Sequence, residues 1–99
     1  MRKVTVSELA RLKAAMIVDV REEDEYRLGH IPMARNLPLG QLAARVSELP
    51  TEGDLFVVCQ SGARSQRAAV TLDAAGLPVV NVEGGTSAWI AAGLPIASR

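Results

Sequence analysis

Hydrophobic residues occur along the chain in two patterns, as short continuous runs and as stretches where they recur every three or four positions. The continuous runs are rich in β-branched residues and predict buried strands at 16–20, 54–58 and 78–82, with a brief further strand at 35–37. The helical spacing predicts helices that begin near Val6 and cover 21–28, 39–49, 64–75 and 86–92. Strands alternating with helices in this way are typical of an α/β fold with a mostly parallel sheet covered by helices.

The same spacing assigns several side chains to the core. We expect Leu9 and Leu12 on the buried face of the first helix, and Ala68 and Leu72 on the inner face of the fourth helix. Trp89 is expected to anchor the last helix in the core.

Composition narrows the class of protein. A chain of 99 residues with 48% hydrophobic residues predicts one domain, 1–99, with a core of its own. The formal net charge is zero, which favours neither a nucleic-acid nor a membrane partner. No run approaches the roughly 18 apolar residues of a membrane span, and no apolar segment follows the basic start. We therefore expect a cytoplasmic protein, and a monomer because no long amphipathic seam is present.

The most informative segment for function surrounds Cys59, the only cysteine of the chain. An apolar strand ends at this residue, a short polar loop containing Gly62 follows, and a helix is predicted to begin where the loop ends. This order places the thiol beside inward-pointing backbone N–H groups at the positive end of a helix dipole. Because both favour the reactive thiolate, the pattern indicates a nucleophile rather than a small core residue.

The residues after the loop refine that prediction. Arg64 and Ser65 offer a fixed charge and a hydroxyl at the helix start, and Arg35 is a further candidate for positive charge near the site. Four residues separate Cys59 from Arg64, one fewer than in the cysteine-phosphatase pattern. The smaller ring suits a sulfane sulfur carried on the cysteine better than a phosphoryl group. A single cysteine excludes an internal disulfide and a multi-cysteine zinc site.

Four blocks of the sequence, in the expected order, resemble the single-domain rhodanese (thiosulfate sulfurtransferase) family. They are VDVRE at 18–22, GHIPMARNLP at 29–38, CQSGARS at 59–65, and EGGTSAW at 83–89 with GLP at 93–95. The resemblance covers roughly residues 5–96. The family usually has glycine where this chain has Met33, a departure that concerns the local turn and not the activity.

The resemblance implies a rhodanese-like three-layer domain, with a five-stranded, mostly parallel sheet flanked by helices on both faces. It implies that Cys59 is catalytic and carries a persulfide between two half-reactions, without a metal or an organic cofactor. The sulfur donor would be thiosulfate or a persulfide, and the acceptor cyanide or a thiol, including a thiol of a protein partner. The outer sulfur would be held by the backbone N–H groups of the substrate-binding loop, Gln60, Ser61, Gly62, Ala63, Arg64 and Ser65.

Two other functions share the thiolate-and-loop arrangement and stay open at this point. The domain would serve as a persulfide carrier or docking module if it delivered sulfur to a protein partner with poor thiosulfate turnover. A small cysteine phosphatase or arsenate reductase is the second alternative, against which stand the short Cys59–Arg64 spacing and the lack of a clear general-acid loop.

Other polar residues receive structural interpretations. Asp19 and Arg21 are expected to form a charge pair that fastens a strand end to a neighbouring segment. His30, the only histidine, is interpreted as a turn residue with hydrogen-bonded ring nitrogens. The acidic run 22–25 is interpreted as a solvated face in the first turn of a helix, and Gly84–Gly85 as a tight turn.

Overall fold

The structure is a computed structural model that describes residues 2–98. Its strands are β1 (Arg2–Val4), β2 (Met16–Asp19), β3 (Arg35–Asn36), β4 (Leu55–Val58) and β5 (Val79–Val82). Its α-helices are α1 (Val6–Ala10), α2 (Glu23–Leu28), α3 (Leu42–Arg45), α4 (Ala63–Ala74) and α5 (Gly85–Ala91). Short 3₁₀ helices at Leu39–Gln41 and Val46–Glu48 flank α3.

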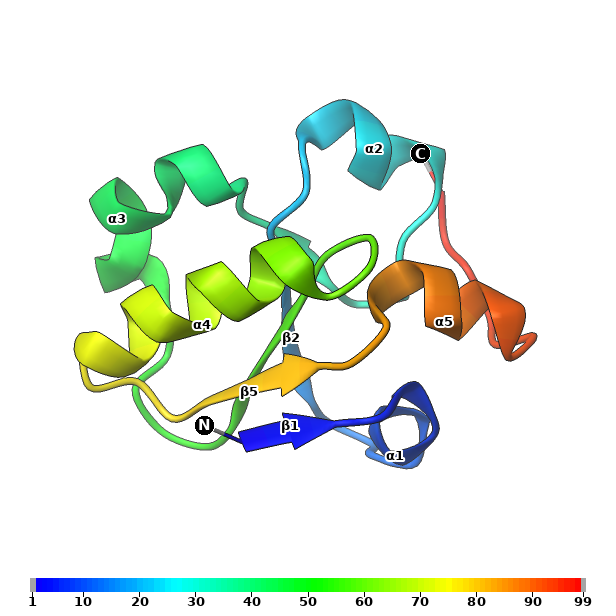
Figure 1. The fold of residues 1–99 in the computed structure, drawn as a ribbon, viewed down its shortest axis with the longest axis horizontal. Helices are drawn as coiled ribbons and strands as arrows, with labels where there is room; N and C mark the ends of the chain where they lie inside the picture. Colours follow the sequence, from blue (N-terminus) through cyan, green and yellow to red (C-terminus); the bar gives the residue numbers. More distant parts are fainter. Residues whose placement is uncertain (1, 99) are drawn as a thin grey trace.

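The five strands form one sheet in the order β1-β5-β4-β2-β3, and every neighbouring pair is parallel. Helices cover both faces of this sheet (Figure 1), which confirms the predicted fold class. The edge strand β1 was not predicted, because two of its three residues are charged. Its pairing with β5, with Val4 opposite Val82, adds the strand that the apolar pattern could not reveal.

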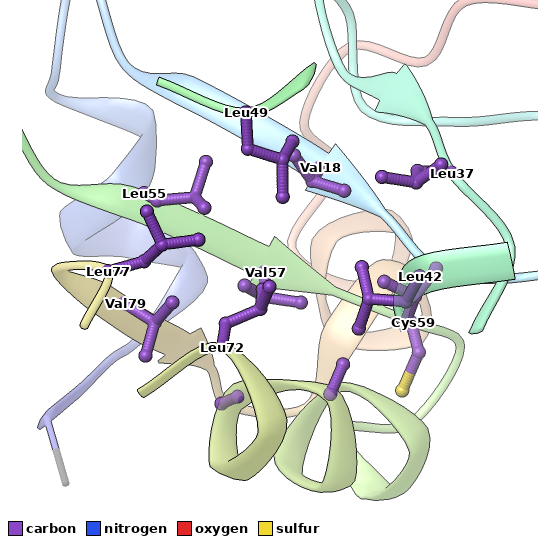
Figure 2. Packing of buried hydrophobic residues seen from close by; sticks show 13 residues of the cluster. Val18, Leu37, Leu42, Leu49, Leu55, Val57, Cys59, Leu72, Leu77 and Val79 are labelled. Atoms are coloured by element: carbon purple, nitrogen blue, oxygen red, sulfur yellow. The ribbon is translucent and has the colours of Figure 1, made fainter. Parts of the chain in front are cut away.

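Side chains of the central strand β4 alternate between two hydrophobic cores. Leu55 and Val57 face the core covered by α3 and α4, whereas Phe56 and Val58 face the core containing residues of α1 and α5. Cys59, one residue beyond the strand, continues this alternation and joins the first core. Figure 2 shows its sulfur at the end of β4, on the side where α4 lies. The strand register therefore decides the direction of the thiol.

Two predictions about helices are wrong. Leu12 is not buried: α1 ends at Ala10, so the helical spacing no longer applies, and 48% of Leu12 is exposed. The segment 39–49 is not one continuous helix but three short ones, in line with the low helix propensity of Gly40 and Val46. The spacing still carries information, because Leu42 is buried in the core.

Among residues 2–98, no helix has the length and apolar character that crossing a membrane requires. The chain near the carboxyl end instead returns to the body of the domain. His30 and Ala97 form an antiparallel bridge in which each backbone N–H donates to the carbonyl of the other, at 2.8 and 2.9 Å.

Met33 adopts the left-handed backbone conformation, with φ of 72°. The turn that the resemblance associates with glycine is thus present here with methionine. The Cβ of Met33 makes this backbone conformation strained. The side chain is 78% exposed and contributes little burial in return.

Replacing Met33 by glycine should raise the free energy of unfolding by about 1 kcal/mol, because glycine tolerates this φ without a steric clash of Cβ. Equilibrium unfolding in urea measures the change. Met33→Ala is the matched control, since it removes the same exposed side chain but keeps Cβ. Equal stability of the two variants would show that the turn is not strained.

Candidate active site

Cys59 lies where β4 passes into a tight loop that leads directly into α4. The residue is 1% exposed, and its sulfur accepts a hydrogen bond from the Gly62 backbone N–H at 3.0 Å. Gly62 precedes the first residue of α4 and has φ of 106°, a conformation that residues with a Cβ rarely adopt. This glycine turns the chain so that the loop amides face the sulfur.

Two opposing influences set the acidity of the thiol. Burial raises the pKa of Cys59, but hydrogen bonds from the Ser65 hydroxyl and from the backbone N–H groups of Ser65, Gly62 and Ser61 lower it more. The pKa of Cys59 is consequently held below its ordinary value, because these donors stabilise the negative sulfur. The site thus combines a buried sulfur with preformed stabilisation of its charge.

The first turn of α5 holds the outer side of the loop. The backbone N–H of Thr86 donates to the Cys59 carbonyl at 2.8 Å, and that of Ser87 donates to the Gln60 carbonyl at 2.9 Å. This approach requires glycine at position 85, because a Cβ there would lie 2.3 Å from the Cys59 carbonyl oxygen. With these carbonyls bonded outward, the loop N–H groups are left to face the sulfur.

The side chain of Gln60 is part of a polar network and does not point freely into the site. Its Oε1 accepts from Arg21 Nη1 at 3.0 Å, and its Nε2 donates to Ser87 Oγ at 2.7 Å. Arg21 in turn bonds the Asp19 carboxylate and, at 2.8 Å, the Gly29 carbonyl. The predicted Asp19–Arg21 pair is therefore present, buried, and fastens the end of β2 to the loop.

Arg64 does not extend freely toward a substrate either. Its two Nη groups donate to the two carboxylate oxygens of Glu25 at 2.7 and 2.9 Å. The Arg64 guanidinium lowers the pKa of Glu25 to about 2, so the pair is fully charged at neutral pH. The interpretation of 22–25 as a solvated face is wrong for Glu25, because the first turn of α2 lies against the start of α4; the other three acidic residues are exposed.

Ser65 connects the thiol to a buried amide that the sequence analysis overlooked. The Ser65 hydroxyl has one proton, for which Asn81 Oδ1 at 2.6 Å and the Gly62 carbonyl oxygen at 3.1 Å compete as acceptors with the thiolate. Asn81 Nδ2 donates to Gln66 Oε1 at 3.2 Å, which orients the amide. The signal for Asn81 was its position as the one polar residue within the apolar strand β5.

The remaining residues that the sequence suggested for the site either lie outside this hydrogen-bond network or have exposed side chains. Ser61 and Ala63 have exposed side chains, so only their backbone is available to the loop. His30 bonds the Tyr26 carbonyl through Nδ1 at 2.8 Å and stacks on the Tyr26 ring, as expected of a turn residue. Arg35 forms an exposed ion pair with a glutamate of the second 3₁₀ helix.

No group of His, Cys, Asp and Glu side chains among residues 2–98 is arranged to hold a metal ion. What this arrangement can do chemically is present a thiolate whose charge is stabilised by backbone dipoles. It can equally hold a second negative atom attached to that sulfur, because the same N–H groups point into the loop.

Ser65→Ala should raise the pKa of Cys59, because it removes a donor that stabilises the thiolate. With less thiolate present, alkylation of Cys59 by iodoacetamide at neutral pH should slow roughly tenfold and its pH profile should move to higher pH. Ser61→Ala is the matched control, since this exposed loop serine keeps its backbone N–H. An unchanged profile in Ser65→Ala would show that the hydroxyl does not support the thiolate.

Gly85→Ala should lower the free energy of unfolding by at least about 2 kcal/mol, because its Cβ collides with two loop carbonyls and its φ of 58° disfavours a side chain. Thermal and urea unfolding measure the loss. The control is Gly76→Ala, which has a similarly positive φ but open space around the added Cβ. Equal losses would mean that backbone strain alone, and not the close approach, explains the result.

Comparison with known proteins agrees with this geometry. The family model of the rhodanese-like domain matches residues 5–92. A protein named sulfurtransferase from Allochromatium vinosum is 40% identical over 89 residues, covering 89% of this chain and 83% of its own. A putative sulfur carrier protein of Bacillus subtilis is 40% identical over 74 residues, covering 74% of this chain and 40% of its own.

Among solved structures, a rhodanese-related protein from Thermoplasma volcanium superposes with a TM-score of 0.95 at 33% identity, covering 100% of both chains. Sequence, fold and the position of the cysteine loop thus lead to one assignment: the chain belongs to the rhodanese-like domain family.

Proposed function

We propose that this protein is a sulfurtransferase that moves a sulfane sulfur from thiosulfate or a persulfide to cyanide or a thiol through a persulfide on Cys59. The observation that carries the proposal is the Cys59 sulfur itself, buried at the end of β4 with the Gly62 N–H 3.0 Å away and its pKa held down. The similarity to proteins named as sulfurtransferases supports the same reaction class.

In the first half-reaction the Cys59 thiolate attacks the outer sulfur of the donor. The new S–S bond forms as the donor's own bond to that sulfur breaks, and sulfite or the donor's thiolate leaves with the bonding electrons. The step uses no general base, because the lowered pKa of Cys59 favours the thiolate. The step is covalent catalysis, which divides one transfer into two easier ones.

In the second half-reaction an acceptor attacks the outer sulfur of the Cys59 persulfide. The Cys59 sulfur leaves as the thiolate and returns to its starting state. The loop N–H groups stabilise negative charge on the persulfide and on the leaving sulfur without rearrangement, as an oxyanion hole does. This role falls to the backbone of Gln60 to Ser65.

A persulfide carrier that delivers sulfur to a protein partner is the second candidate function, favoured by the likeness to the putative sulfur carrier of Bacillus subtilis. It uses the same Cys59 persulfide and differs only in the acceptor.

The assignment to the rhodanese-like family favours sulfur transfer over the phosphatase or arsenate reductase alternative. A cytoplasmic, monomeric protein of one domain fits either function.

Incubation with thiosulfate or a thiol persulfide, followed by intact-protein mass spectrometry without reductant, should add one sulfur, about 32 Da, to the wild-type chain. Cyanide should remove the added mass, because it accepts the outer sulfur. Cys59→Ser should gain nothing and should show no transfer.

Addition of sulfur to Cys59→Ser, or no addition to a wild-type thiol shown to be free with either donor, would refute the proposal. Fast loading with slow release to cyanide, but fast release to a protein thiol, would identify the carrier.

A further inference from the structure

We propose that Glu25 sets the donor specificity of this site: by holding Arg64 it favours a persulfide of a thiol over thiosulfate as the sulfur donor. This inference rests on the proposed sulfur transfer through Cys59 and names the donor class for it.

The charged side chains bonded to the loop or to its first helical residues cancel in pairs. Arg64 is held through both Nη groups by the Glu25 carboxylate. Arg21 is held by the Asp19 carboxylate, with 3% and 0% of the two side chains exposed. Neither arginine therefore brings a net positive charge to an incoming donor.

The same charges act on one another across the site. Glu25, Cys59 and Asp19 all raise the pKa of Arg64, because each negative group favours its charged form. With Cys59 ionised, the two ion pairs and the thiolate sum to one negative charge. The positive potential that remains comes from the loop N–H groups and from the dipole of α4, equivalent to roughly half a charge.

The two donor classes place different amounts of charge in this site. Thiosulfate is a dianion, so its attack by the Cys59 thiolate gathers three negative charges and ends as the persulfide anion plus sulfite dianion. A thiol persulfide gathers fewer, two in its ionised form and one in its protonated form: the thiolate attacks the outer sulfur, the S–S bond breaks, the donor thiolate departs, and the outer sulfur keeps its negative charge or its proton. Both reactions conserve charge, but the first, with more negative charge gathered, depends more on a neighbouring free cation.

Glu25 keeps the Arg64 guanidinium from acting as such a free cation, because it binds both of its Nη groups. Arg64 begins at the second residue of α4, next to the thiol loop, and one-third of its side chain is exposed. Without the Glu25 carboxylate, the Arg64 guanidinium would be available to the sulfonate end of thiosulfate. A guanidinium can bind two oxygens of such an anion through two parallel N–H groups. Glu25 therefore acts on specificity through Arg64, as a positioning residue.

Glu25→Gln tests the proposal, because the amide keeps the size and one acceptor of Glu25 but removes its charge. We expect the ratio of kcat/KM for thiosulfate to kcat/KM for the persulfide of 2-mercaptoethanol to rise about tenfold, mainly through a lower KM for thiosulfate. Adding Arg64→Ala should abolish the rise. Loading of Cys59 is followed by intact mass, so each donor is measured on the same product.

Glu23→Gln is the matched control, since it changes the net charge equally, also releases an arginine (Arg27), and lies on an exposed face of α2. It should leave the ratio within about twofold. A second measurement needs no variant: higher ionic strength should speed wild-type loading from thiosulfate more than loading from the persulfide, which carries less negative charge.

The outcomes separate the inference from the function on which it rests. If neither donor loads wild-type Cys59, both fail. If both donors load it but Glu25→Gln leaves their ratio unchanged, or Glu23→Gln raises it as much, the sulfurtransferase stands and the role of Glu25 is overturned. An equal response of both donors to ionic strength overturns it as well.

Discussion

The structure depends on two backbone hydrogen bonds, from the N–H groups of Thr86 and Ser87 to the carbonyls of Cys59 and Gln60. A tight loop can direct its amides inward only if its carbonyls find donors on the outside, because buried backbone groups must be paired. The first turn of α5 supplies those donors, as helix starts have N–H groups without partners. The geometry around the Cys59 sulfur is thus made by two segments whose bonded residues lie 27 positions apart in the sequence, held together by β5 beside β4.

Buried charge is the second organising element. The Asp19–Arg21 pair costs desolvation, which excellent geometry and additional hydrogen bonds offset. Arg21 uses its remaining donors on Gly29 and Gln60, so one guanidinium joins the end of β2, the segment after α2 and the cysteine loop. The network thus connects three segments of the chain around the start of the loop.

The sequence predicted the buried strands, the helix after the loop and the position of Cys59 between a strand and that loop, because apolar runs, helical spacing and one glycine are local signals. It did not predict β1, whose residues gain a strand conformation only by pairing with β5. It also missed Glu25 and Asn81, whose roles arise from contacts with Arg64 and Ser65. Hydrogen-bond partners that lie 39 and 16 positions apart produce no periodic pattern in a single sequence.

Because side chains alternate between the two faces of the sheet along β4, insertions near the end of this strand would move the Cys59 sulfur. Inserting one residue between Val57 and Cys59 would turn the sulfur to the opposite face of the sheet, away from α4. Inserting two would restore the face but carry the sulfur about 7 Å beyond the amides that α4 and its loop present. The exposed side chains of Ser61 and Ala63 can vary, whereas the number of residues between the core of β4 and its cysteine is fixed by geometry.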